Sequence, residues 1–104
     1  MAVEVTKKQE GSKMTIAVSG KLNTPGSETL RSEISDLNGI KELIFDFQDV
    51  SYISSAGFRV IIEAYKMIGD NKGTMKVINV NAENMHTFQL TGLLDVLDVS
   101  GPEA

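Results

Sequence analysis

A short apolar strand followed by a long amphipathic helix constrains the fold of this chain more than any other feature. Residues 43–47, Leu-Ile-Phe-Asp-Phe, are short, apolar and aromatic, as expected of a strand at the centre of a sheet. Residues 75–80 predict another strand. Between them, apolar side chains recur at the spacing of one helical face, at Phe58, Ile61, Ile62, Tyr65 and Ile68. A strand, a helix and a strand in succession indicate parallel neighbouring strands joined by a right-handed crossover.

An alternating pattern precedes this unit and predicts an N-terminal hairpin. Apolar and polar residues alternate over 3–5 and again over 14–18, with a turn at residues 10–12. Such alternation is typical of half-buried strands joined in a hairpin. The hairpin adds at least one antiparallel edge to the parallel strands.

Two further helices are indicated by their caps. Thr24-Pro25 suits the N-cap and first position of a helix that ends at Asn38-Gly39. Asn81 suits the cap of a short helix closed by Thr91-Gly92, after which residues 94–99 predict a weaker last strand. We therefore expect an α/β fold, a small mixed sheet of four to five strands with helices packed on it, in the order ββαβαβα(β).

Charge and composition argue against several classes of function. A chain of 104 residues is the size of one domain, so residues 1–104 are expected to form a single domain. The net charge is −4 and the basic residues are scattered, which disfavours nucleic-acid or anionic-membrane binding. The absence of cysteine excludes a disulfide, a thiolate nucleophile and a thiolate metal site. Without a signal-like start or an apolar run near the roughly 20 residues of a membrane span, we expect a cytoplasmic protein.

The segment Ser54-Ser55-Ala56-Gly57 stands where such a fold places its functional sites. We expect Phe47 to end the central strand, Gln48–Ser54 to form a loop, and Ser55 to lie at or next to the N-cap of the following helix. In open α/β sheets, ligands and chemistry gather beyond the carboxyl ends of the strands. The first turn of a helix has unpaired N–H groups and a partial positive charge, which small residues leave uncovered.

Two interpretations of Ser55 are open on these residues alone. As a plain helix cap it needs no further function, because serine is among the commonest N-caps. As a phosphate acceptor it would meet helix N–H donors and a favourable dipole worth about 0.3–1 kcal/mol. The phosphate would add roughly −1.5 to −2 charges to a neutral surface. A partner that packs on the free hydroxyl would then face a dianion, and close unfavourable charge contacts cost several kcal/mol.

The stretch Phe45–Val60, FDFQDVSYISSAGFRV, closely resembles the signature of STAS domains, and within these that of the bacterial anti-sigma factor antagonists. Gly20–Thr24 resembles the G-x-L-D segment that precedes the first helix in that family, and Leu90–Leu93 resembles its closing segment. The resemblance covers nearly the whole chain, and the fold of the family has the element order expected above.

The resemblance implies a switch controlled by phosphorylation. In that family a serine at the start of the second helix is phosphorylated by an anti-sigma factor with serine kinase activity. The unphosphorylated form binds this kinase and frees the sigma factor, and a PP2C-type serine phosphatase resets the cycle. The family motif D-S-[ST]-G places the phosphoacceptor two residues before the glycine, which is Ser55 here. The chain is then a substrate rather than an enzyme, with no catalytic residue and no cofactor.

The resemblance also implies a partner surface made of two segments. One follows the second strand and the other follows the third, so they are expected to lie side by side at one end of the sheet. Their residues are Leu22, Asn23 and Thr24, and Ser54, Ser55, Ala56, Gly57 and Phe58. Phe58 suits core packing and partner anchoring equally well. Asn23 and Ser54 each stand where the family usually has aspartate, so each loses a charge.

Other polar residues suit structural roles better than chemistry. Asp46 and Asp49 could suggest the phosphotransfer pocket of a receiver domain, but the sequence has neither an acidic pair after its first strand nor the lysine after a late strand that such a pocket needs. Two carboxylates without a third ligand also make a poor metal site. His86, the single histidine, lies on a short amphipathic segment, and no nucleophile-elbow pattern surrounds Ser55. We therefore expect no metal site.

Two alternative functions stay open. One is a STAS interaction subunit of an ABC-type lipid transporter or of a stress-signalling scaffold, in which docking does not depend on phosphorylation. The other is an enzyme that uses Ser55 as nucleophile and His86 as base.

Overall fold

The computed structural model describes residues 3–102 and confirms an α/β fold built on a mixed sheet. The helices and strands follow the predicted order ββαβαβα(β). They are β1 (Glu4–Glu10), β2 (Lys13–Leu22), α1 (Thr24–Glu33), β3 (Glu42–Ile53), α2 (Ser55–Asp70), β4 (Thr74–Ile78), α3 (Ala82–Thr91), the 3₁₀ helix η1 (Leu93–Asp95) and β5 (Asp98–Val99).

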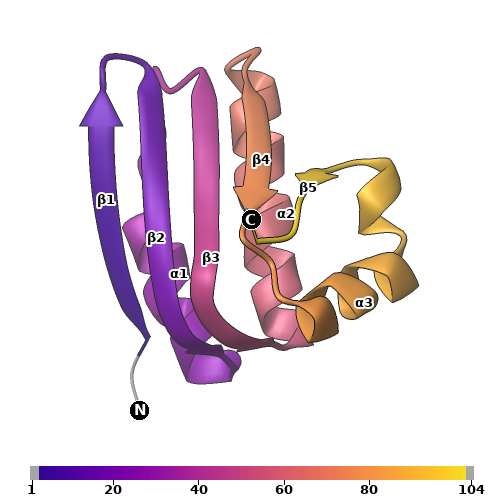
Figure 1. Cartoon of the computed structure of the whole chain (residues 1–104). Coiled ribbons are helices and arrows are strands. Elements are labelled where there is room, and N and C mark those ends of the chain that lie inside the picture. The colour runs from indigo at the N-terminus through magenta and orange to yellow at the C-terminus, as the bar shows by residue number, and fades with distance from the viewer. Residues whose placement is uncertain (1–2, 103–104) are drawn as a thin grey trace.

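The five strands lie in the sheet in the order in which they occur in the chain, β1-β2-β3-β4-β5. β1 is antiparallel to β2 through the predicted hairpin, and the other neighbours are parallel. Successive crossovers in the same direction and of the same hand place their helices on one face of a sheet. Accordingly α1 and α2 lie together behind the sheet, and α3 lies near the end of the sheet, where it contacts β3 (Figure 1).

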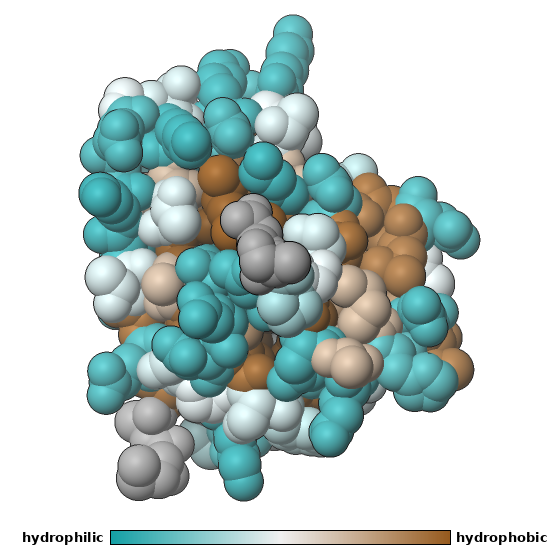
Figure 2. All heavy atoms as spheres, viewed as in Figure 1, coloured by the Kyte–Doolittle hydropathy of each residue, from teal (hydrophilic) through white to brown (hydrophobic). Residues whose placement is uncertain are grey.

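The two faces of the sheet differ in character. Side chains toward α1 and α2 are apolar and buried, including Ile16, Phe45 and Val77, which are fully buried. The opposite face is mostly hydrophilic, with apolar surface showing only between the polar side chains (Figure 2). Within residues 3–102, no helix is both long and apolar enough to cross a membrane.

The first helix ends earlier than predicted, at Glu33 rather than near Asn38-Gly39. The apolar residues Ile34 and Leu37 are buried as the periodicity indicated, but they belong to an irregular segment. Asp36 Oδ1 accepts a hydrogen bond from the Asn38 N–H at 3.1 Å, a local turn that competes with helix.

The central strand is longer than predicted, and this corrects the loop expected at Gln48–Ser54. β3 continues to Ile53 because it contains two bulges. Where β2 advances from Ala17 to Ser19, β3 advances from Asp46 to Asp49. Where β2 advances from Gly20 to Lys21, β3 advances from Val50 to Tyr52. Each step inserts one extra residue, which breaks the two-residue alternation of a regular strand.

Candidate functional site

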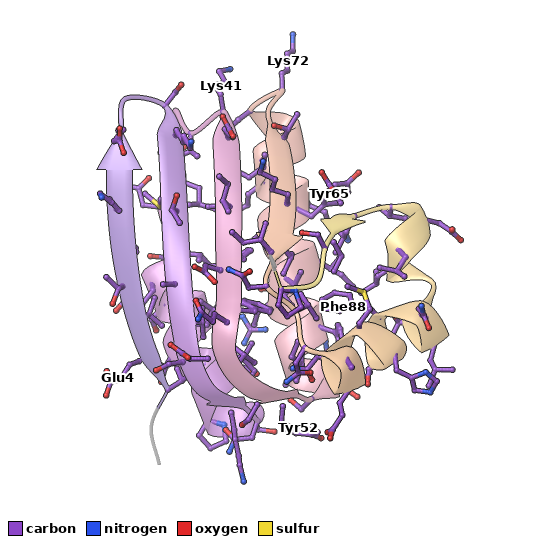
Figure 3. All side chains as sticks on the ribbon, in the orientation of Figure 1. Glu4, Lys41, Tyr52, Tyr65, Lys72 and Phe88 are labelled. Carbon is purple, nitrogen blue, oxygen red and sulfur yellow. The ribbon has the colours of Figure 1, made fainter. Side chains whose placement is uncertain are left out.

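Two helices begin side by side at one end of the sheet, beyond the carboxyl ends of β2 and β3. Leu22 at the end of β2 pairs with Ile53 at the end of β3, and the strands are parallel. One residue beyond each strand end, α1 begins at Thr24 and α2 begins at Ser55. The prediction that residues 22–24 and 54–58 lie together is therefore confirmed. In Figure 3, Tyr52 marks this end of the sheet, and Lys41 and Lys72 mark the opposite end.

The carbonyl group of Leu22 ties the two helix starts together. It accepts hydrogen bonds from Ser54 N at 2.9 Å and from Ser54 Oγ at 2.6 Å. The Ser27 hydroxyl in α1 also reaches it, at 3.4 Å, and donates to Asn23 O at 2.7 Å. One backbone oxygen thus connects the end of β2 with both helices.

The N-caps of the two helices are Asn23 and Ser54. Asn23 Oδ1 accepts a hydrogen bond from Gly26 N at 2.9 Å, and Ser54 Oγ accepts one from Gly57 N at 3.3 Å. The prediction that Thr24 caps α1 is therefore wrong. Thr24 is the first residue of the helix. Asn23 takes that role because it has the extended backbone of a cap and a side-chain oxygen that reaches the helix N–H groups.

Ser55 is the first residue of α2 and is exposed. Its hydroxyl forms no hydrogen bond with any other part of residues 3–102, whereas the neighbouring Ser54 hydroxyl both donates and accepts. The interpretation of Ser55 as the helix cap is wrong, because Ser54 fills that role. The two adjacent serines thus have different roles: Ser54 caps α2, and the Ser55 hydroxyl is exposed to solvent.

Glycine is required at the third position of both helices. A Cβ atom on Gly26 would lie 2.3 Å from the carbonyl oxygen of Lys21. A Cβ atom on Gly57 would lie 2.9 Å from Ile53 Cγ2 and 3.0 Å from Leu22 Cβ. The two starts, Asn23-Thr24-Pro25-Gly26 and Ser54-Ser55-Ala56-Gly57, therefore share one pattern: a cap, an exposed hydroxyl, a spacer and a glycine that lets the helix approach the strand end.

Three residues of the expected partner surface are buried, which corrects their predicted role. Leu22 is fully buried, Gly57 is buried, and Phe58 is 7% exposed. The Phe58 ring packs edge-to-face on Phe88 of α3, with ring centroids 4.9 Å apart. These residues support the site from beneath, and the accessible surface is left to Asn23, Thr24, Ser54, Ser55 and Ala56.

A groove runs from Ser55 along the outer side of α2. It has a volume of about 400 Å³ and is lined by Ser55, Phe58, Arg59, Ile62, Glu63, Lys66 and Thr91, which together we call the α2 groove. The residue patterns did not single out Arg59 or Lys66 as part of the site. Tyr52 was also not singled out; it lies in β3 two residues before Ser54, and its side chain is 51% exposed.

The charges of the α2 groove are not balanced. Arg31 of α1 donates hydrogen bonds to both carboxylate oxygens of Glu63, from Nε to Oε1 at 3.0 Å and from Nη2 to Oε2 at 3.1 Å. These hydrogen bonds hold the pKa of Glu63 below its usual value. Arg31 also contacts Glu28. Arg59 and Lys66 form no ion pair within residues 3–102, although both also act on the Glu63 carboxylate at longer range and lower its pKa.

The remaining polar residues named from the sequence lie apart from this chemistry. Asp46 Oδ1 accepts hydrogen bonds from Asn79 Nδ2 at 3.0 Å and from Gln48 N at 3.1 Å, so it braces the first bulge of β3. Asp49 is exposed on β3, and His86 is exposed on α3. Across the described part of the chain, no three His, Asp or Glu side chains converge in a way that could hold a metal ion.

The different roles of the two serines predict different costs of substitution. We expect Ser54→Ala to lower the free energy of unfolding by about 1–2 kcal/mol, because it removes the cap of α2 and the hydroxyl bond to Leu22. We expect Ser55→Ala to change it by less than about 0.5 kcal/mol, since the side chain is exposed and unbonded. Urea unfolding of both variants measures the difference, and equal losses would contradict the assignment of the cap.

Comparison with known proteins finds a family model and a relative that each match nearly the whole chain. A family model described as STAS domain matches residues 4–102. The anti-sigma-B factor antagonist of Bacillus subtilis is 28% identical over 101 residues, which cover 96% of this chain and 93% of that protein.

Solved structures share the fold. An anti-sigma factor antagonist from Mycobacterium paratuberculosis superposes with a TM-score of 0.83 at 18% identity, over 94% of this chain and 85% of that one. The anti-sigma factor antagonist SpoIIAA in its unphosphorylated form gives 0.81 at 18% identity, over 92% and 87%. SpoIIAA of Bacillus in the phosphorylated form gives 0.73 at 18% identity, over 92% and 90%.

Proposed function

The chain belongs to the STAS domain family, and from this membership we propose that it is an anti-sigma factor antagonist whose binding is switched off by phosphorylation of Ser55. The observation that carries the proposal is the placement of Ser55. Its hydroxyl is exposed at the first position of α2, while the neighbouring Ser54 holds the helix in place. A kinase can therefore modify Ser55 without disturbing a bond on which the fold depends.

The unphosphorylated protein binds an anti-sigma factor that has serine kinase activity, and the sigma factor is released. The binding surface consists of the accessible residues at the two helix starts, Asn23, Thr24, Ser54, Ser55 and Ala56. Neither α1 nor α2 has an acidic residue in its first turn, so this surface carries the partial positive charge of two helix ends without compensation.

Phosphorylation changes this surface much more than it changes the fold. The phosphate adds roughly −1.5 to −2 charges. The helix end tolerates the new charge, because the first N–H groups of a helix have no intrahelical acceptor. A partner seated on the neutral hydroxyl must instead accommodate a dianion, and each 1.4 kcal/mol of that cost reduces affinity tenfold. A PP2C-type serine phosphatase restores the binding form, so this chain is a substrate of both enzymes.

The proposal is tested by capture from a lysate of the cells that make the protein. The baits are the wild type, Ser55→Glu and Ser12→Glu, with retained proteins identified by mass spectrometry. Ser12 is the matched control, because it is an exposed serine in the turn between β1 and β2, at the opposite end of the sheet. We expect the wild type and Ser12→Glu to retain a protein with a kinase-type ATPase domain, and Ser55→Glu to retain at least roughly tenfold less of it.

The captured kinase provides a direct second readout. With ATP it should phosphorylate the wild type at Ser55 and leave Ser55→Ala unmodified. If all three baits retain the same transporter or scaffold proteins instead, the chain is a constitutive interaction subunit and the proposed function is wrong.

A further inference from the structure

Arg59 lies in the same groove as the phosphoacceptor and forms no direct ion pair within the described residues. Ser55 and Arg59 are four residues apart on α2, both are exposed, and both line the α2 groove. Residues four apart on a helix are neighbours on its surface. Arg59 forms no hydrogen bond or ion pair with any other described residue, so its guanidinium is free to turn toward Ser55.

A carboxylate four residues from Arg59 on the same helix is already engaged by another side chain. Glu63 lies four residues beyond Arg59 on the same helix, which is a favourable spacing for an ion pair. However, Arg31 of α1 binds both of its oxygens, at 3.0 and 3.1 Å. A planar guanidinium that meets a carboxylate through two parallel bonds is a strong and directional partner. The hydrogen bonds from Arg31 thus engage both Glu63 oxygens, and Arg59 interacts with Glu63 only at longer range, without a direct ion pair.

We propose that Arg59 is the intramolecular receptor for the phosphoryl group on Ser55. The inference rests on the proposed function, in that it requires Ser55 to carry a phosphate. The ester oxygen of the phosphoserine belongs to the first residue of α2, and the guanidinium approaches the phosphoryl oxygens from one turn further along the groove. Gly57 N is taken by Ser54 Oγ, so the N–H groups of Ser55 and Ala56 remain as additional donors at the helix start.

This pairing would change the charge of the α2 groove as well as that of Ser55. In the unmodified protein the free charges of the groove are those of Arg59 and Lys66, both positive. After modification the phosphate adds roughly −1.5 to −2 charges and engages Arg59. The positive charge of the groove is then largely cancelled, so a partner that approaches along α2 meets a nearly neutral surface.

The pairing has a measurable signature in the second ionisation of the phosphate. A nearby cation stabilises the dianion more than the monoanion, so it lowers the second pKa of the phosphoserine. The experiment uses the full chain with phosphoserine installed at position 55 during translation, and follows the phosphorus NMR shift against pH. We expect Arg59→Gln to raise this pKa by about half a unit relative to the wild-type background.

Two further variants make the result specific. Lys66→Gln removes the same charge from the same groove, but Lys66 is eleven residues from Ser55 on the helix, three turns away, so we expect a much smaller shift. Arg59→Lys keeps a cation within reach and should recover part of the lowered pKa. The inference is overturned if Arg59→Gln leaves the pKa unchanged, or if Arg59→Gln and Lys66→Gln shift it equally, which would indicate only the overall charge of the protein.

Failure of this inference is distinguishable from failure of the proposed function. The phosphoserine is encoded, so the titration does not depend on any cellular kinase or partner. An unchanged pKa in Arg59→Gln would remove Arg59 as the receptor and leave the switch at Ser55 intact. Capture experiments that show no dependence on Ser55 would remove the switch and leave the measured pairing as it stands.

Discussion

Replacing Gly26 with alanine is expected to destabilise the fold by about 3 kcal/mol or more, because the new methyl group has nowhere to go. Its carbon would lie 2.3 Å from the carbonyl oxygen of Lys21, which is backbone and cannot rotate aside. The first turn of α1 would have to lift from the end of β2, and the cap at Asn23 would move with it. Chemical denaturation of the purified variant measures the loss.

A second glycine serves as the control for this substitution. Gly69 is also in a helix, but a Cβ atom there would meet nothing within 4 Å. Gly69→Ala should therefore be neutral or stabilising by up to about 1 kcal/mol, from the better helix propensity of alanine. If Gly26→Ala proves as stable as Gly69→Ala, the close approach of α1 to β2 described above is wrong.

The second large effect is expected from Phe88→Ala, which should cost about 3–5 kcal/mol. Phe88 is fully buried and extends from α3 toward the interior (Figure 3), where its ring meets Phe58 of α2. The substitution leaves a cavity beneath the first turn of α2, next to Ser55. We therefore expect weaker partner binding in addition to a lower melting temperature.

Leu90 on the same helix provides the matched control for Phe88. Its side chain is 74% exposed, so Leu90→Ala should change the free energy of unfolding by less than about 0.5 kcal/mol. Thermal unfolding of the two variants under the same conditions compares them. Similar losses for both would mean that α3 does not pack on α2 through Phe88.

The sequence predicted the order and type of the elements because its apolar residues recur at the regular spacing of helices and strands. The face Phe58, Ile61, Ile62, Tyr65 and Ile68 identifies α2, and alternation identifies β1 and β2. Once these elements are ordered, the rule for parallel strands brings the ends of β2 and β3 to one edge. The position of Ser55 beside the start of α1 then follows from topology alone.

The extent of β3 was not predictable from alternation. Over residues 47–53 the buried positions are Phe47, Val50 and Ile53, a spacing of three where a regular strand has two. Two bulges produce this spacing, and bulges are specified by pairing with β2 rather than by the local sequence. The polar residues between the buried ones then look like a loop.

The sequence also could not predict that Arg59 lacks a direct ion pair with Glu63. Spacing along α2 pairs Arg59 with Glu63, and only the three-dimensional structure shows that Arg31 of α1 holds Glu63 instead. The cap of α1 was missed for a smaller reason. Thr24 and Asn23 are both good caps, and the choice between them depends on which backbone is extended at the end of β2.

The order of the strands also bears on how fast this chain reaches its fold. Every strand pairs with the one that precedes it, but three of the four pairings are parallel and join residues 22 to 32 positions apart. Such long-range parallel pairings fold slowly, because the entropy of closing each loop is lost before its contacts form. The hairpin of β1 and β2 is the one local pairing among the described strands, so we expect it to form early. The paired ends of β2 and β3, which position Ser55, require the whole of α1 between them and are expected to form late.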